Sequence, residues 1–105
     1  MNNPMEEWPV ERIENEKRRA AILRHLMNST DNECGDQLLA HACRALGITS
    51  SPIQIRAAIA YLTEAGLVTR QDFDEIVVVK ITKEGKAVAR GHMSVPGIMT
   101  PTDFD

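Results

Sequence analysis

The chain has 105 residues, of which 43% are hydrophobic and 26% charged, and its formal net charge is −3. This length suits one domain with its own apolar core, and no stretch approaches the roughly 20 apolar residues of a membrane span. Two cysteines are too few for a disulfide framework, and the N-terminus lacks the basic and then apolar pattern of a secretion signal. We therefore expect a cytoplasmic, single-domain protein.

The charge is unevenly distributed along the chain. Residues 1–16 hold five acidic residues and one basic residue, residues 17–90 hold eleven basic and eight acidic residues, and residues 91–105 add two acidic residues. The central part is thus mildly basic, at +3, between two acidic flanks. Such a balance is compatible with a nucleic-acid partner but does not by itself indicate one.

The first predicted helix runs from Pro9 to about residue 28, after a flexible arm at residues 1–8 in which Trp8 is expected to cover one edge of the core. The first half of this helix is polar almost all round, so it projects into solvent or meets a partner chain. The basic run at residues 17–19 is interpreted as a solvated helix face, with phosphate contact as the alternative. The residues expected to face inward are Ala20, Ile22, Leu23, Leu26 and Met27.

A loop at residues 29–35, with a very short strand near Cys34, leads to a second predicted helix at about residues 36–46. Asp36 is its expected N-cap. A tight turn at residues 47–50 follows, from which Ile48 is expected to point inward. We predict that Leu38, Leu39, Ala42 and Leu46 face the core and that Ala40, His41 and Arg44 face outward.

The strongest local signal is a third helix at residues 52–65. Ser51 is a favourable N-cap, Pro52 suits the first helical position, and Gln54 completes a capping box with Ser51. Gly66 suits the left-handed conformation that ends a helix. Helical spacing places Ile55, Ala58, Ile59 and Leu62 inward and Ile53, Arg56, Ala57, Ala60 and Glu64 outward.

After this helix the pattern changes to strand. Residues 67–70 and 76–81 are predicted strands, joined by a turn at residues 71–75 that carries Asp72, Asp74 and Glu75. Thr82 can cap a last helix at residues 83–90, whose Ala87 and Val88 dock on the core. The tail at residues 92–105 contains prolines and glycine and is expected to be extended chain rather than a further layer.

The predicted order of helix, short strand, helix, helix, hairpin and helix resembles the winged-helix transcription regulators of the MarR and ArsR type. Residues 59–68 (IAYLTEAGLV) are similar to the segment in which the recognition helix leads into the wing, and residues 81–89 (ITKEGKAVA) to the segment after the wing. The resemblance covers about residues 17–90. It implies a mainly α fold with a small β-hairpin (α+β), a winged helix-turn-helix domain at residues 9–91.

A closer likeness is to the small winged-helix proteins of Mu-like bacteriophages and prophages. Those proteins share an Arg-rich first helix, here residues 18–24, and a tail similar to residues 95–98. The likeness implies a phage-related origin and supplies little mechanism.

In a helix-turn-helix the second helix enters the major groove, while the first crosses the DNA backbone. The resemblance therefore implies a double-stranded DNA-binding protein, a transcription regulator that reads the groove with helix 52–65 and acts as a homodimer through the first helix and the C-terminal segment. Gln54 can pair with adenine and Arg56 with guanine, and the alternative for Gln54 is a role as a cap alone. The candidate DNA-binding residues are His41, Arg44, Ser50, Ser51, Ile53, Gln54, Arg56, Ala57, Ala60, Arg70 and Lys80.

Several alternatives stay open. The acidic hairpin turn repels phosphate, with only Arg70 and Lys80 as compensation, so the exposed face around Ile53 can instead serve to dock another protein. A metal sensor is disfavoured because the cysteines lack a C-x-C or C-x-x-C spacing, and Cys43 is better explained as a small core residue. No catalytic or cofactor motif is present, so we expect neither an enzyme nor a cofactor.

Overall fold

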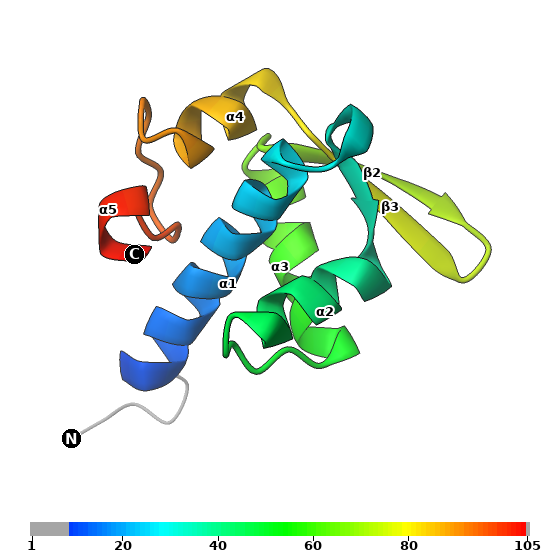
Figure 1. The fold of residues 1–105 in the computed structure, drawn as a ribbon, viewed down its shortest axis with the longest axis horizontal. Coiled ribbons are helices and arrows are strands. Elements are labelled where there is room, and N and C mark those ends of the chain that lie inside the picture. Colours follow the sequence, from blue (N-terminus) through cyan, green and yellow to red (C-terminus); the bar gives the residue numbers. More distant parts are fainter. Residues whose placement is uncertain (1–8, 105) are drawn as a thin grey trace.

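The computed structural model describes residues 9–104, so the expected arm at residues 1–8, with Trp8, lies outside the described residues. Within this range the chain is an α+β protein with five α-helices and a three-stranded antiparallel sheet (Figure 1). No helix of the described part combines the length and the apolar character needed to cross a membrane. The elements are α1 (Pro9–Met27), the 3-10 turn η1 (Thr30–Asn32), β1 (Glu33–Gly35), α2 (Asp36–Ala45), α3 (Pro52–Glu64), β2 (Val68–Phe73), β3 (Ile76–Ile81), α4 (Lys83–Ala89) and α5 (Pro101–Phe104).

Helix α1 is the central element, because it contacts α2, α3, α4, α5 and the strands β1 and β3. In Figure 1 it runs diagonally through the molecule, with α2 and α3 on one side and α4 and α5 on the other. Its C-terminal half buries Ala21, Ile22, Leu23 and Leu26, while the predicted inward residues Ala20 and Met27 are partly buried against the same core. The prediction for this half of the helix is therefore largely confirmed.

The faces of α2 differ from the prediction. Leu38 and Leu46, expected to be buried, are 57% and 51% exposed, and Ala42 is half-buried. Ala40, expected to face outward, is buried. The N-cap is Gly35, and Asp36 is the first helical residue. Strand β1 leads directly into α2 and pairs with β3, so the sheet fixes how the helix starts and turns a different stripe inward. That stripe has regular helical spacing and consists of Asp36, Leu39, Ala40 and Cys43.

Helix α3 and the turn before it follow the prediction closely. Gly47 has a φ of +80°, which suits glycine at the end of α2, and Ile48 is buried. Ser51 and Gln54 form the complete capping box. The helix ends at Glu64, before Gly66 with a φ of +76°. The predicted inward residues Ile55, Ala58, Ile59 and Leu62 are all buried.

The hairpin is longer than predicted. β2 pairs with β3 in antiparallel register from Val68 opposite Ile81 to Phe73 opposite Ile76, so the turn is only two residues long and not five. All six residues of β3 pair with residues of β2, in keeping with the high β-propensity of β3. β1 pairs with the other edge of β3, which gives the strand order β1-β3-β2. The hairpin projects away from the helices (Figure 1).

Thr82 caps α4 as predicted, because its side chain accepts a hydrogen bond from the backbone N–H of Gly85. Val88 is buried against the core, and Ala87 is half-buried.

The C-terminal segment corrects the prediction of an extended tail. The Tyr61 hydroxyl donates to the Pro96 carbonyl (2.8 Å), and Arg19 Nη1 donates to the Gly97 carbonyl (2.9 Å). The Met99 N–H donates to a carbonyl of α1, and Ile98 is buried in the core. The segment therefore folds back onto α1 and α3, because it supplies apolar side chains to a surface that α4 leaves uncovered.

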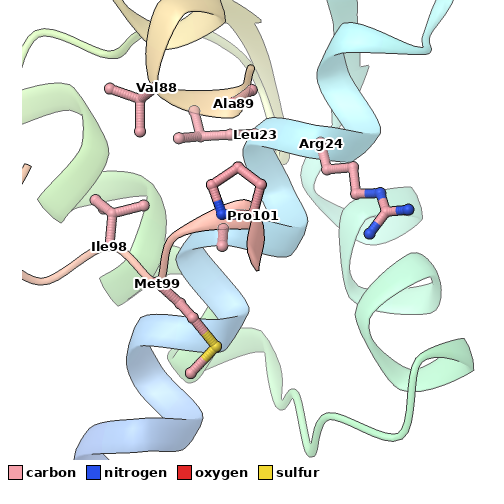
Figure 2. Close-up of a pocket in the computed structure, with 8 residues that line it drawn as sticks. Leu23, Arg24, Val88, Ala89, Ile98, Met99 and Pro101 are labelled. Atoms are coloured by element: carbon pink, nitrogen blue, oxygen red, sulfur yellow. The ribbon is translucent and has the colours of Figure 1, made fainter. Parts of the chain in front are cut away.

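A pocket of about 210 Å³ lies between α1, α4 and the C-terminal segment (Figure 2). This volume is below the roughly 300–1,000 Å³ of typical small-molecule sites, so we assign it no ligand. Its lining residues are Ala20, Leu23, Arg24, Val88, Ala89, Ile98, Met99 and Pro101.

Candidate nucleic-acid interface

The outward flank of α3, defined as Ile53, Arg56, Ala57 and Ala60, is exposed along its length. Ile53 has the highest exposed fraction of the large apolar residues, at 81%. The C-terminal segment contacts α3 at Tyr61, which lies outside this flank, so the described tail does not cover it. The predicted groove-facing residues of the helix are thus brought together on one accessible surface.

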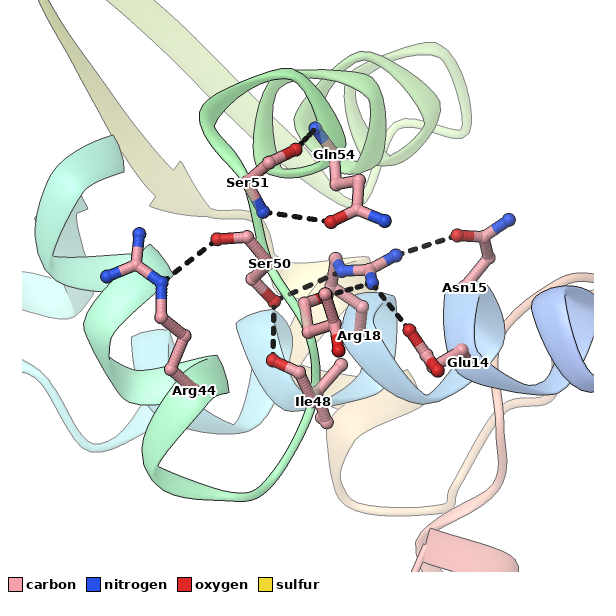
Figure 3. Close-up of polar contacts among 9 residues, drawn as sticks. Glu14, Asn15, Arg18, Arg44, Ile48, Ser50, Ser51 and Gln54 are labelled. Carbon is pink, nitrogen blue, oxygen red and sulfur yellow. Dashed lines mark hydrogen bonds and ion pairs between the residues drawn. The ribbon is translucent and has the colours of Figure 1, made fainter.

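The N-terminus of α3 is closed by the reciprocal cap (Figure 3). The Ser51 N–H donates to Gln54 Oε1 (2.8 Å), and the Gln54 N–H donates to Ser51 Oγ (3.1 Å). A bidentate contact between glutamine and adenine uses both the oxygen and the nitrogen of the side-chain amide. Since Oε1 is already engaged, Gln54 acts as a cap in this conformation and reads adenine only if the cap opens.

Arg18 corrects the interpretation of residues 17–19 as a solvated face. Its side chain is 1% exposed and lies between α1 and the turn that joins α2 to α3 (Figure 3). Its Nε donates to Ser50 Oγ (3.2 Å), and its Nη2 donates to the Thr49 carbonyl. On α1 itself, Nη1 donates to Asn15 Oδ1 (2.7 Å), and Nη2 pairs with Glu14 (3.3 Å). Arg18 therefore attaches the turn before α3 to the central helix.

Ser50 also differs from the expectation. It is 3% exposed, and its hydroxyl accepts from Arg18 and donates to the Ile48 carbonyl (3.0 Å), so it cannot reach a phosphate in this conformation. Its carbonyl accepts from Nε of Arg44, at 3.0 Å. Arg44 and His41 are both exposed on α2, as predicted. Of the two serines predicted to contact phosphate, only Ser51 is exposed.

Arg56 has an acidic neighbour on α2. Its Nε lies 3.6 Å from Oδ2 of Asp36, and the exposed fractions of the two side chains are 56% and 10%. The arginine thus keeps most of its surface in solvent while its inner nitrogen faces a buried carboxylate.

The β2–β3 hairpin offers little free positive charge, because one of its basic residues is paired and its turn is acidic. Arg70 makes a bidentate contact to Asp72, with Nε and Nη2 at 3.1 and 3.0 Å from Oδ1. Asp74 and Glu75 form the exposed turn, and Lys80 is exposed on β3. Positive charge therefore lies near α3 and the hairpin base, and the end of the hairpin is acidic.

Both cysteines are buried free thiols. Burial raises the pKa of Cys34 and of Cys43 above the usual thiol range, so both remain protonated at neutral pH. Within residues 9–104 no three His, Cys, Asp or Glu side chains lie close enough to hold a metal ion.

Two residues with a part in this surface, Arg18 and Asp36, were missed from sequence. A signal existed for each. Arg18 precedes Ile22 and Leu26 by four and eight residues, so it lies on the same buried stripe. Asp36 stands at the head of the stripe that α2 buries. A charged residue on an apolar stripe indicates a buried polar contact.

Comparison with known proteins relates the chain to bacteriophages. It is 36% identical over 86 residues to "Uncharacterized protein gp26" of Escherichia phage Mu, and the match covers 82% of this chain and 88% of the relative. The chain therefore belongs to the same family as this phage Mu protein, which confirms the predicted phage relation. No protein-family model matches the chain. The relative's name states no activity, so DNA binding stays a prediction.

Proposed function

We propose that this protein is a winged helix-turn-helix transcription regulator that binds double-stranded DNA with α3 in the major groove, and that it is not an enzyme. The observation that carries the proposal is the exposed outward flank of α3, a helix whose start is closed by a cap and whose preceding turn is fixed to α1 by Arg18. In this arrangement α2 is the helix that crosses the DNA backbone, and the β2–β3 hairpin is the wing.

The side chains of the flank suit recognition of bases both by hydrogen bonds and by apolar contacts. In this proposal Arg56 donates to a guanine, and the exposed Ile53 and Ala57 offer methyl groups of the kind that pack against the methyl group of thymine. The exposed Ser51 hydroxyl, the N-terminus of α3 and Arg44 are the proposed phosphate contacts. Ser50 is left out of the proposed contact set because it is buried, and Gln54 because its side-chain oxygen accepts from the Ser51 N–H. Ser51 and Arg44 also make hydrogen bonds within the protein, but the Ser51 hydroxyl proton and the terminal nitrogens of Arg44 remain available as donors.

One copy offers few phosphate contacts, and the acidic end of the hairpin repels DNA. We therefore propose a homodimer, in which two copies double the contacts. Residues 95–99 of the tail pack on their own chain, which leaves the N-terminal half of α1 as the proposed dimer surface. There Val10 and Ile13, spaced to lie on one helix face, are 71% and 52% exposed.

A second candidate is a winged-helix module that binds another protein. It is favoured by the exposed apolar side chains outside α3, since Leu38 and Ile76 line one shallow groove and Phe73 lies opposite Ile76 on the hairpin. Their exposed fractions are 57%, 53% and 53%. Such a surface does not depend on phosphate, and its binding would be far less sensitive to salt.

The proposal is tested by titrating the full chain with duplex DNA at several salt concentrations. Four proteins are compared: the wild type, Arg56→Ala, the charge-matched control Arg90→Ala at the C-cap of α4, and Asp72→Asn. Each lost phosphate contact lowers the slope of log affinity against log salt by about one. We expect steep salt dependence, weaker and less selective binding by Arg56→Ala, and little change for Arg90→Ala.

Asp72→Asn tests the electrostatics of the hairpin. It removes a negative charge and frees Arg70 from its bidentate partner, so duplex affinity and the salt slope are expected to rise. No detectable duplex binding by the wild type even at low salt would refute the DNA-binding proposal. Equal loss in Arg56→Ala and Arg90→Ala would remove α3 as the reading helix.

A further inference from the structure

A buried carboxylate lies behind the arginine on the exposed flank of α3. Oδ2 of Asp36 is 3.6 Å from Nε of Arg56, and the Asp36 side chain is only 10% exposed. Its second oxygen, Oδ1, is buried and has no hydrogen-bond partner among the described residues. A buried polar atom without a hydrogen-bond partner lowers the stability of the fold. Stability therefore does not explain why an aspartate occupies position 36.

The position of Asp36 is fixed by the fold. It is the first residue of α2, directly after β1, and it stands on the stripe that α2 buries. Its backbone is thereby held between the sheet and the core, and its side chain has little freedom to move. Arg56 by contrast is a long side chain on a solvent-facing helix surface, with many rotamers available to it.

The contact is made to Nε, the inner nitrogen of the guanidinium. At 3.6 Å this is an ion pair and not a hydrogen bond, so it biases the orientation of the guanidinium and leaves the two terminal nitrogens available to donate together to O6 and N7 of a guanine. A guanidinium biased toward one orientation by the carboxylate loses less conformational entropy when it binds a base than one with no charged neighbour.

We propose that Asp36 is a positioning residue that orients Arg56 for recognition of a guanine. This inference rests on the proposed function, since it assumes that the flank of α3 meets a duplex. It predicts an unusual combination of effects. The carboxylate helps to select the base, yet its negative charge opposes the DNA backbone, so its removal lowers selectivity without lowering affinity for duplex of random sequence.

The experiment first selects the preferred duplex of the wild-type chain from a random pool. Affinities are then measured for that duplex, for its single-base variants and for a random duplex, with the wild type, Arg56→Ala and Asp36→Asn. Asparagine keeps the shape of the side chain and removes its charge. Asp36→Ala replaces it if the asparagine variant does not fold, and circular dichroism and thermal melting identify variants with native structure.

We expect Arg56→Ala to abolish a preference for guanine at one position, worth roughly tenfold to a hundredfold for a good bidentate contact. Asp36→Asn is expected to reduce the same preference at least about fivefold while its affinity for random duplex is unchanged or higher. A purely structural role would instead lower the affinities for all duplexes together, and that result would overturn the inference.

The remaining outcomes separate the two proposals. If the wild type selects a duplex but Asp36→Asn keeps the full guanine preference, Asp36 has no positioning role and the proposed function stands. If Arg56→Ala changes no base preference, the inference is overturned and Arg56 loses its proposed role in reading guanine, while duplex binding by the protein stands. If the wild type binds no duplex, the proposed function itself fails, and this inference fails with it.

Discussion

Replacement of Arg18 by methionine is the sharpest test of how α3 is held. Methionine fills much of the same buried volume but makes none of the hydrogen bonds. Two of these bonds, to the Thr49 carbonyl and to Ser50 Oγ, join α1 to the turn before α3. The contacts to Asn15 and Glu14 stay within α1, and the Glu14 side chain is 40% exposed, so they contribute less.

Hydrogen bonds that involve a charged group contribute about 1.5–3 kcal/mol each. Two such bonds correspond to about 3–6 kcal/mol, and relief of the cost of burying a guanidinium lowers the expected loss to about 3 kcal/mol. Arg18→Lys keeps the charge but has a point-like head group in place of the planar fork. We expect it to lose about half as much.

The free energy of unfolding is measured by urea denaturation followed by far-ultraviolet circular dichroism. Arg12→Met, at an exposed position of the same helix, is the control and is expected to change stability by less than about 0.5 kcal/mol. A loss below about 1 kcal/mol for Arg18→Met would show that the contacts of the buried arginine in Figure 3 do not hold the turn.

Two further predictions concern the tail and the thiols. Gly97→Ala is expected to destabilise the protein by about 2–4 kcal/mol, because a Cβ at this position, where φ is +86°, would lie 2.0 Å from the Tyr61 hydroxyl. Gly47→Ala is the control, since Gly47 has a similar φ of +80° but open space around it. We expect this variant to lose only about 1 kcal/mol. Equal losses in thermal melts of the two variants would contradict the packing of the tail. Because burial raises the pKa of Cys43, the unfolded chain loses the thiol proton first, so the free energy of unfolding should fall as pH rises above about 8.5. Cys43→Ala should make that fall shallower in urea titrations between neutral and alkaline pH, and an unchanged slope would count against the stated cause.

Local signals account for the parts of the fold that were predicted well. The cap at Ser51, the glycines after α2 and α3 and the β-prone run of β3 each specify their structure through short-range chemistry, and all appear in the structure. The inward face of α3 follows from the same periodicity. The exposed flank of the candidate site is simply the remainder of that helix.

Long-range contacts account for the errors. The orientation of α2 depends on the pairing of β1 with β3, more than 40 residues away in sequence, as in Cys34 opposite Val79. The tail was assigned from its prolines and glycine, although Ile98 gains burial on α1. The prediction for Arg18 rests on its charge and that for Asp36 on its suitability as an N-cap, whereas the structure places both on buried, largely apolar stripes. In each case tertiary context outweighed residue type.

The return of the C-terminal segment to α1 has a consequence for synthesis. A nascent chain emerges from its N-terminus, so α1, α2 and α3 leave the ribosome while residues 95–99 are still inside the exit tunnel. Until these residues emerge, the apolar side of α1 that receives Ile98 is bare, and the Tyr61 hydroxyl lacks its acceptor. The packing of residues 95–99 on α1 and α3 is therefore the last of these contacts to form during synthesis, and until then that side of α1 is open to chaperones.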